Sequence, residues 1–189
     1  MIDQAITYAA LVHKDQKRKG SGQPYIFHPL EVLNLVSMMT LDDDTLCAAV
    51  LHDTVEDTDA TIEDIRREFG EHVAKLVSYE TEDKRKGQKK SDTWLERKKE
   101  AVETIRSIDE IGGKMVCLAD KVSNLRGFHL GLLDEGEAFW DHFNQKDPTM
   151  HYWYYSELKD ALIELKDQAV YKEYCFLIDT IFGTYIKEQ

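Results

Sequence analysis

Apolar residues recur at helical spacing along almost the whole chain, and this periodicity constrains the fold more than any other feature. Ile2, Ile6 and Ala9 fall on one face of a first helix, and His13 follows on the same face one turn later. No segment shows the alternation of apolar and polar residues that a half-buried strand requires. We therefore expect an all-α protein.

Capping residues, prolines and glycines set the expected limits of the other helices. Pro29 suits the first position of a helix, Thr61 with Asp64 approximates a capping box, and Gly112-Gly113 separates two helices. We expect helices over residues 29–39, 43–52, 61–69, 71–80, 94–106, 114–128, 135–144, 156–166 and 170–186.

The chain length of 189 residues suits one well-filled hydrophobic core. We predict a compact single domain over residues 1–189, with a core over about 2–130 and a C-terminal helical extension over about 131–189.

The net charge of −12 argues against a general nucleic-acid or membrane-surface binder, which would need a basic face. Basic residues do cluster locally, at residues 14–19 and 82–99, so a small polyanion could still be bound. No apolar run is long enough to span a membrane, and the N-terminus lacks the pattern of a signal peptide. Three widely spaced cysteines, Cys47, Cys117 and Cys175, read as buried reduced thiols. We expect a cytoplasmic protein.

The stretch LHDTVEDT, residues 51–58, places an imidazole and three carboxylates directly behind an apolar helical turn. If the helix continues through it, His52 and Glu56 share one face, and Asp53 and Asp57 share the neighbouring face. Imidazole and carboxylate together suit a borderline or hard divalent ion. The alternative is a solvated helix end.

Two distant residues could complete a metal site. His28 lies between an apolar tripeptide and Pro29, where it would face the core at a helix entrance. Asp120 lies on an apolar helix face, where an uncompensated carboxylate is costly to bury. A metal ion would compensate that cost.

Each of these residues also has a purely structural interpretation. His28 could be a hydrogen-bonded histidine at a helix start, and Asp57 with Asp59 could cap the helix that begins at Thr61. Asp120 could pair with Lys121 or Arg126. The residues alone leave these alternatives open.

His28, the adjacent pair His52-Asp53 and the distant Asp120 resemble the H…HD…D signature of the HD metal-dependent phosphohydrolases. The segments RKGSGQPYIFHPLEV, AAVLHDTVEDTDATIEDIRREFGEHVAKLV and CLADKVSNLRG further resemble the hydrolase domain of the RelA/SpoT family, over about residues 5–130. The later FWDHFN and WYYSEL segments resemble small free-standing members. Since the chain ends where a synthetase domain would follow, we expect a hydrolase-only protein of the small alarmone hydrolase type.

This resemblance implies an HD-domain fold and hydrolysis of the 3′-pyrophosphate of ppGpp or pppGpp, guanosine alarmones of the stringent response. The products would be GDP or GTP and pyrophosphate, and the cofactor would be Mn²⁺ or another divalent ion. The implied metal ligands are His28, His52, Asp53 and Asp120. Glu56 and Asp57 match the family's catalytic pair. The residues that match its nucleotide-binding positions are Arg18, Lys19, Asn124 and Arg126.

Other functions remain open at this point. The substrate could be another nucleotide, such as an adenosine alarmone or NADPH, or the protein could be a non-catalytic nucleotide sensor or antitoxin-like partner. Residues 84–90, with Arg97 and Lys98, could form a flap that contacts substrate, or merely a solvated charge run. We expect Trp153, Tyr154 and Tyr155 to pack in the core rather than stack on a base. The expected partner is a small-molecule nucleotide, with no nucleic acid and no membrane.

Overall fold

The protein is helical throughout the residues that its computed structural model describes, which are 1–18, 21–81, 87, 89 and 91–186. The elements are α1 (Ile2–Val12), α2 (Phe27–Ser37), α3 (Asp43–Leu51), α4 (Thr54–Asp57), α5 (Ile62–Phe69), α6 (Glu71–Ser78), α7 (Trp94–Ser107), α8 (Ile111–Glu135), the 3₁₀ helix η1 (Gly136–His142), α9 (Pro148–Ala161), the 3₁₀ helix η2 (Ile163–Leu165) and α10 (Ala169–Ile186). Within these residues β pairing is limited to an isolated bridge between Lys17 and Pro24. The all-α prediction is confirmed.

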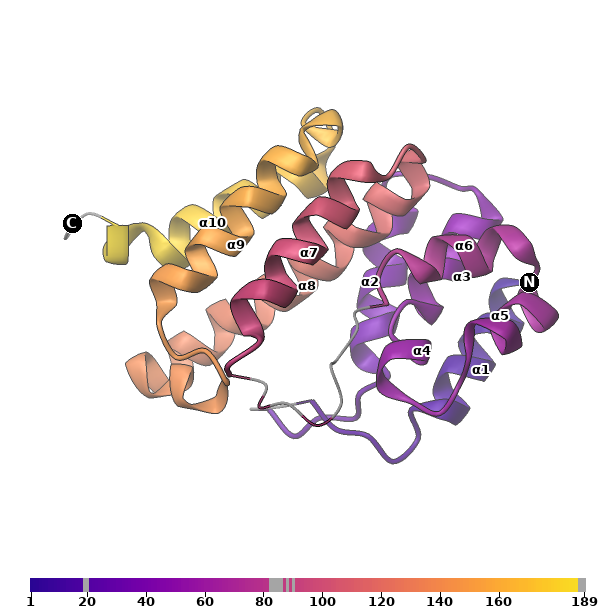
Figure 1. Cartoon of the computed structure of the whole chain (residues 1–189), viewed down its shortest axis with the longest axis horizontal. Helices are drawn as coiled ribbons and strands as arrows, with labels where there is room; N and C mark the ends of the chain where they lie inside the picture. The colour runs from indigo at the N-terminus through magenta and orange to yellow at the C-terminus, as the bar shows by residue number, and fades with distance from the viewer. Residues whose placement is uncertain (19–20, 82–86, 88, 90, 187–189) are drawn as a thin grey trace.

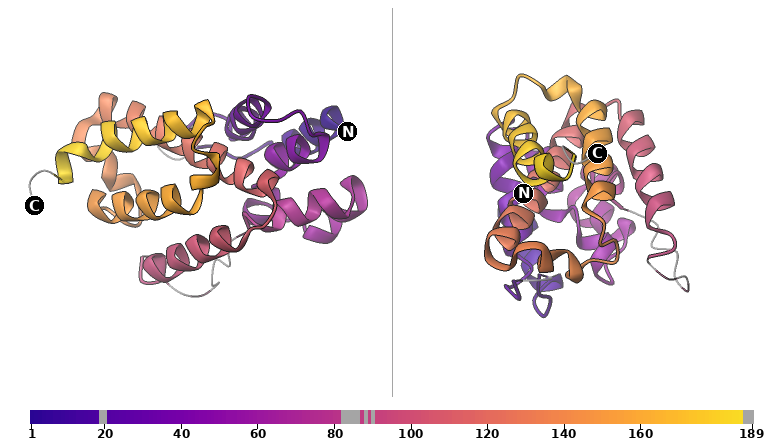
Figure 2. Two further views of the ribbon diagram at one scale, coloured as in Figure 1. Left: turned by 90° about the horizontal axis from the view of Figure 1, so that it is seen from above. Right: turned by 90° about the vertical axis from the view of Figure 1, so that its left-hand side faces the viewer.

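The long helix α8 joins the two ends of the molecule (Figure 1). Helices α2, α3 and α6 pack against it, and α1 packs on α3. On the other side α10 runs along α8, α9 packs on α10, and α7 packs on α9. The left-hand view of Figure 2 shows the same division from above, with the N-terminus and the C-terminus at opposite ends of the molecule. A residue on α8 can therefore meet groups from both ends of the chain.

Helix α3 is the central element of the N-terminal group. All residues from Thr45 to Leu51 are buried, and α3 contacts α1, α2, α6 and α8. Because a helix that is apolar on every side must be surrounded by protein, its end lies in the interior. His52, the residue that follows this helix, is 0% exposed.

Local capping explains why several of these helices begin where predicted. The Asp42 carboxylate accepts a hydrogen bond from the Thr45 amide at 2.9 Å at the start of α3. Thr61 and Asp64 form a reciprocal capping box at the start of α5, as expected. Gly70 ends α5 with a φ of 94°, a conformation that glycine adopts at little cost.

Glycines on both sides of the helix that we expected over residues 114–128 lie inside α8. This helix begins at Ile111, so it includes Gly112-Gly113, and it passes Gly131 to end at Glu135. A Cβ atom at Gly112 would lie 2.6 Å from Thr45 Oγ1, and one at Gly131 would lie 2.1 Å from the Phe139 ring. These glycines permit close packing, and the boundary that we placed near residue 130 falls within a continuous helix.

Other expected helix limits were also wrong. Helix α2 begins at Phe27, which places Pro29 at its third position, where no backbone N–H is needed. The expected helix over 135–144 is the 3₁₀ helix η1, and the one over 156–166 begins earlier, at Pro148, with Asp147 as its cap. The chain does not continue as one helix through residues 52–57, because α3 ends at Leu51 and α4 begins at Thr54.

The cysteines are free thiols, with Cys47 and Cys117 buried and Cys175 half-buried. No helix in the described part of the chain combines the length and apolar character needed to cross a membrane.

The glycine positions of α8 generate a matched pair of predictions. We expect Gly131→Ala to destabilise the fold by about 1–3 kcal/mol, because its methyl group would overlap the Phe139 ring. Gly127→Ala should raise stability by up to about 1 kcal/mol, because a Cβ there meets no atom within 4 Å and alanine favours the helix. Urea unfolding would measure both changes, and a Gly131→Ala protein as stable as the wild type would contradict this assignment.

Candidate metal centre

Three side chains from separate helical segments meet at one buried point. His28 comes from the first turn of α2, His52 from the turn after α3, and Asp120 from α8. His28 Nε2 lies 3.3 Å from His52 Nε2 and 3.0 Å from Asp120 Oδ1. One potential ligand atom from each residue lies within 4.8 Å of those of the other two. The packing of α2 and α3 against each other and against α8 creates this meeting point.

Asp53 adds a second carboxylate to this group. Its Oδ2 atom lies 3.3 Å from His28 Nε2 and 3.1 Å from His52 Nε2. The structure therefore brings together all four residues that the resemblance assigns as ligands.

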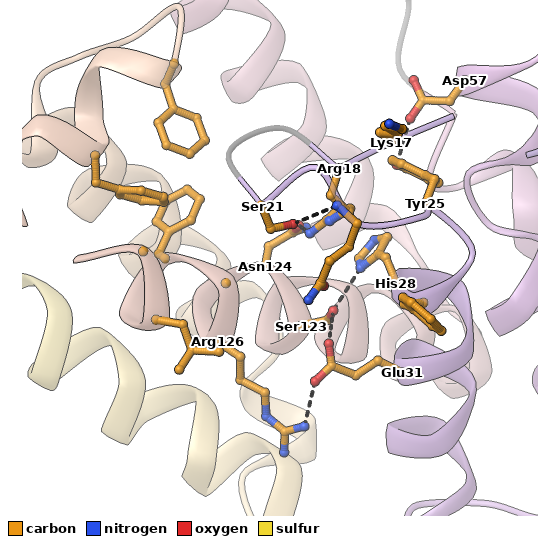
Figure 3. A pocket seen from close by; sticks show the side chains of 18 of the residues that line it. Lys17, Arg18, Ser21, Tyr25, His28, Glu31, Asp57, Ser123, Asn124 and Arg126 are labelled. Carbon is orange, nitrogen blue, oxygen red and sulfur yellow. Dashed lines mark hydrogen bonds and ion pairs between the residues drawn. The ribbon is translucent and has the colours of Figure 1, made fainter. Parts of the chain in front are cut away.

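The hydrogen bonds of the two histidines show why the point requires a positive charge. His52 Nδ1 lies 2.9 Å from the Ala49 carbonyl, which can only accept, so this nitrogen carries a hydrogen. His28 Nδ1 lies 2.8 Å from Ser123 Oγ, whose own hydrogen goes to a Glu31 carboxylate oxygen (Figure 3). In neutral imidazoles both Nε2 atoms are then acceptors, so a proton or a cation must lie between them. Two imidazoles and two carboxylates are donors that fit a borderline or hard divalent ion.

The carboxylates of the centre are ionised in spite of their burial. Burial raises the pKa of Asp53, but the His52 and His28 imidazoles outweigh it and hold that pKa well below its usual range. Burial likewise raises the pKa of Asp120, and the Lys121 ammonium and both imidazoles outweigh it. Burial lowers the pKa of His52, but the two carboxylates raise it well above its usual value. The two carboxylates therefore favour a positive charge at this point, either a proton or a metal ion.

Asp120 approaches the imidazoles and also pairs with Lys121, two contacts that its sequence position had left as alternatives. Its Oδ1 atom faces His28 and accepts a hydrogen bond from Asn124 Nδ2 at 2.7 Å, while Oδ2 pairs with Lys121. Lys121 also contacts Glu80 Oε2 at 3.1 Å. The pairing with Lys121 and the approach to the imidazoles therefore coexist, and Lys121 anchors the carboxylate from its outer side.

Glu56 and Asp57 lie on the short helix α4, one turn beyond His52-Asp53. Asp57 does not cap α5, because Thr61 and Asp64 do so. The Tyr25 hydroxyl lies 2.8 Å from Asp57 Oδ2 and 2.6 Å from Asp53 Oδ2, so it bridges the metal centre and the acidic pair. Both acidic residues line a large open cavity, together with His28.

This cavity has a volume of about 1000 Å³ and adjoins a second one of about 450 Å³ that reaches Asp53 and Asp120. Residues expected to bind substrate that line the larger cavity are Arg18, Asn124, Arg126, Arg97 and Lys98. Lys19, the remaining predicted nucleotide-binding residue, lies outside the described residues, as do residues 84–86, 88 and 90 of the expected flap. The basic residues thus border the space next to the carboxylates.

The predicted substrate-binding residues differ in how they are held. Arg18 Nη2 donates to Asn124 Oδ1 at 2.9 Å, and its guanidinium lies 5.6 Å from the centre of the Tyr25 ring. Arg126 instead forms ion pairs with Glu31 and Glu173. Arg18 and Asn124 therefore lie together beside the metal centre, and Arg126 is bound by two carboxylates.

Tyr154 and Tyr155 pack in the core as expected, each 5% exposed, and Trp153 is half-buried against it. Both tyrosines also line the smaller cavity. The residues that sequence reasoning missed are Tyr25, Glu31, Glu80 and Ser123 in their contacts to the centre. Two of them could have been suspected from their spacing to a candidate ligand. Tyr25 lies three residues before His28, and Ser123 lies three residues after Asp120.

Comparison with known proteins agrees with this geometry. Residues 5–137 match the family model described as HD domain. The sequence is 51% identical to guanosine-3′,5′-bis(diphosphate) 3′-pyrophosphohydrolase of Aquifex aeolicus over 76 residues, which are 40% of this chain and 11% of that protein. It is 41% identical to a Mus musculus protein of the same name over 126 residues, which are 65% of this chain and 66% of that protein. The chain thus spans less than two thirds of the length of either relative.

The fold also resembles a solved structure over nearly its whole length. A metazoan ortholog of SpoT, described as hydrolysing ppGpp, superimposes with a TM-score of 0.73 at 28% identity, covering 97% of this chain and 94% of that one. The expected helical HD fold is confirmed.

The centre predicts a metal-dependent gain in stability. After treatment with a chelator, addition of Mn²⁺ at about 100 times its Kd should raise the free energy of unfolding by up to about 2.7 kcal/mol, because the ion binds only the folded protein. His52→Ala should abolish this gain in thermal unfolding. His72→Ala is the matched control, since this imidazole lies between Asp44 and Glu110 on the surface. An undiminished gain in the His52→Ala protein would contradict the assignment.

Proposed function

The chain belongs to the HD-domain family, and on that premise we propose that it hydrolyses the 3′-pyrophosphate of guanosine tetra- or pentaphosphate. The products are GDP or GTP and pyrophosphate. The observation that carries the proposal is the cluster of His28, His52, Asp53 and Asp120 beside an acidic pair and a large cavity with basic residues in its wall. The names of the Aquifex and mouse relatives support this choice of substrate.

The four clustered residues would hold a divalent ion, which we propose to be Mn²⁺. When bound, the ion lowers the pKa of a water molecule and neutralises charge on a phosphate oxygen. His52 and Asp53 approach from the turn after α3, and His28 and Asp120 approach from α2 and α8. Because these segments pack against one another, the four side chains lie together in the absence of substrate.

Glu56 and Asp57 act on the attacking water. The water oxygen forms a bond to the phosphorus next to the ribose 3′ oxygen, the bond from that phosphorus to the 3′ oxygen breaks, and the 3′ oxygen gains a proton. Glu56 accepts a proton from the water or orients it. Asp57 supports this step through its hydrogen bond to Tyr25, which also reaches the Asp53 carboxylate.

Basic and amide groups bind the nucleotide. Arg18 and Lys19 neutralise one diphosphate arm, while Asn124 and Arg126 lie near the nucleoside. Arg18 and Asn124 are already joined by a hydrogen bond of 2.9 Å, which supports a shared role. Arg97 and Lys98, on α7, line both cavities and supply further positive charge. A small polyanion can thus be bound by a chain whose net charge is −12.

One assay tests the proposal against its rivals. We expect the protein with Mn²⁺ to convert ppGpp to GDP and pyrophosphate, and EDTA to stop this conversion because the centre needs its ion. A panel with an adenosine alarmone and NADPH measures base and substrate preference by product chromatography. Turnover of another nucleotide but not of ppGpp would mean that ppGpp is not the substrate. Binding of these nucleotides without turnover would favour a non-catalytic sensor.

The acidic pair yields a sharper prediction. Glu56→Gln should lower kcat by about 10²- to 10⁴-fold, the usual contribution of a positioned base, and leave the affinity for Mn²⁺ unchanged. Glu63→Gln, on the surface of the next helix in an ion pair with Arg66, should keep wild-type kcat. Steady-state kinetics at saturating Mn²⁺ measure both, and an unchanged kcat in Glu56→Gln would exclude Glu56 as the base.

A further inference from the structure

The outward-facing nitrogen of His28 begins a chain of hydrogen bonds that leads away from the metal centre. His28 Nδ1 lies 2.8 Å from Ser123 Oγ, and Ser123 Oγ donates to Glu31 Oε2 at 2.6 Å (Figure 3). Ser123 is 3% exposed and His28 is 4% exposed. Both side chains are therefore largely buried, at the wall of the larger cavity.

The chemistry of these groups fixes the direction of each hydrogen bond. A carboxylate can only accept, so the single hydroxyl hydrogen of Ser123 points to Glu31. The Ser123 oxygen is then the acceptor for a hydrogen on His28 Nδ1. In neutral His28 this leaves the lone pair on Nε2, the atom that faces His52 and Asp120.

Glu31 is itself held by an ion-pair network that reaches the C-terminal helix. Arg126 Nη1 donates to Glu31 Oε1 at 2.8 Å. The same guanidinium donates through Nε and Nη2 to the two carboxylate oxygens of Glu173 on α10, at 2.6 and 2.9 Å. The network thus connects α2, α8 and α10.

We propose that Ser123 and Glu31 are positioning residues that hold His28 in the tautomer able to bind a divalent ion, and that Arg126 and Glu173 hold Glu31 in place. The inference rests on the metal centre of the proposed function. A partner on the far nitrogen of a ligand histidine sets the ring orientation and increases the basicity of the ligating nitrogen, and its loss weakens metal affinity. Metal binding near α2 consequently depends on a residue of the C-terminal helix.

The test is calorimetric titration of the metal-free full chain with MnCl₂. Ser123→Ala removes the acceptor of His28 and should weaken Mn²⁺ binding by about 10- to 100-fold. Ser123→Thr keeps the hydroxyl and should restore affinity to near the wild-type value. Ser37→Ala is the control, because that exposed hydroxyl donates to the Asn34 carbonyl within α2 and is not part of the network.

Glu173→Gln tests the far end of the network without altering the buried core. It removes a charge that is 34% exposed, and it should weaken Mn²⁺ binding in the same direction as Ser123→Ala but by a smaller factor. Thermal unfolding of each metal-free variant separates this effect from a loss of folding.

The outcomes separate this inference from the proposed function. A wild-type chain that does not bind Mn²⁺ overturns the metal centre and the network with it. A wild-type chain that binds Mn²⁺, with Ser123→Ala and Glu173→Gln binding equally well, overturns the network alone. Equal weakening in Ser123→Ala and Ser123→Thr also overturns it, since packing and not the hydroxyl would then be responsible.

Discussion

The close approach of two imidazole nitrogens, His28 Nε2 and His52 Nε2, is the contact on which the rest of the centre depends. Two acceptors at 3.3 Å repel unless a proton or a metal ion lies between them, and helix packing brings the two rings to this distance. Helix α3 contributes to this packing, because its residues from Thr45 to Leu51 are buried and its end cannot move outward without exposing apolar surface. The carboxylates of Asp53 and Asp120 then make the position favourable for a cation.

Much of the fold could be predicted because apolar periodicity and capping are local properties. The start of α3 behind Asp42 and the capping box at Thr61 depend only on residues within one turn. The glycines of α8 could not be interpreted in this way, because the atoms that forbid a Cβ belong to Thr45 and Phe139 on other elements. Sequence alone does not distinguish a glycine that ends a helix from a glycine that allows another element to pack closely against the helix.

The candidate site likewise contains features that could be predicted from local sequence and features that could not. The four candidate ligands lie together in the structure. His28 and Asp120 could be selected from the sequence because an imidazole or a carboxylate among apolar residues requires a compensating charge. Whether each acts as a ligand stays a prediction. Tyr25 and Ser123 were missed because their contacts join different elements. The same holds for the double role of Asp120, which faces the imidazoles and also pairs with Lys121.

The two histidines are supported in different ways, and this difference affects how the centre can change over generations. His52 Nδ1 is bound to the Ala49 carbonyl, a main-chain group that no side-chain substitution removes. His28 Nδ1 is bound to the Ser123 side chain, which a single codon change can alter. The hydrogen-bond partner of one imidazole is thus independent of side-chain identity, while the partner of its neighbour can be changed by substitution. Descendants of this chain could vary the strength of the centre through the second histidine without rebuilding the first.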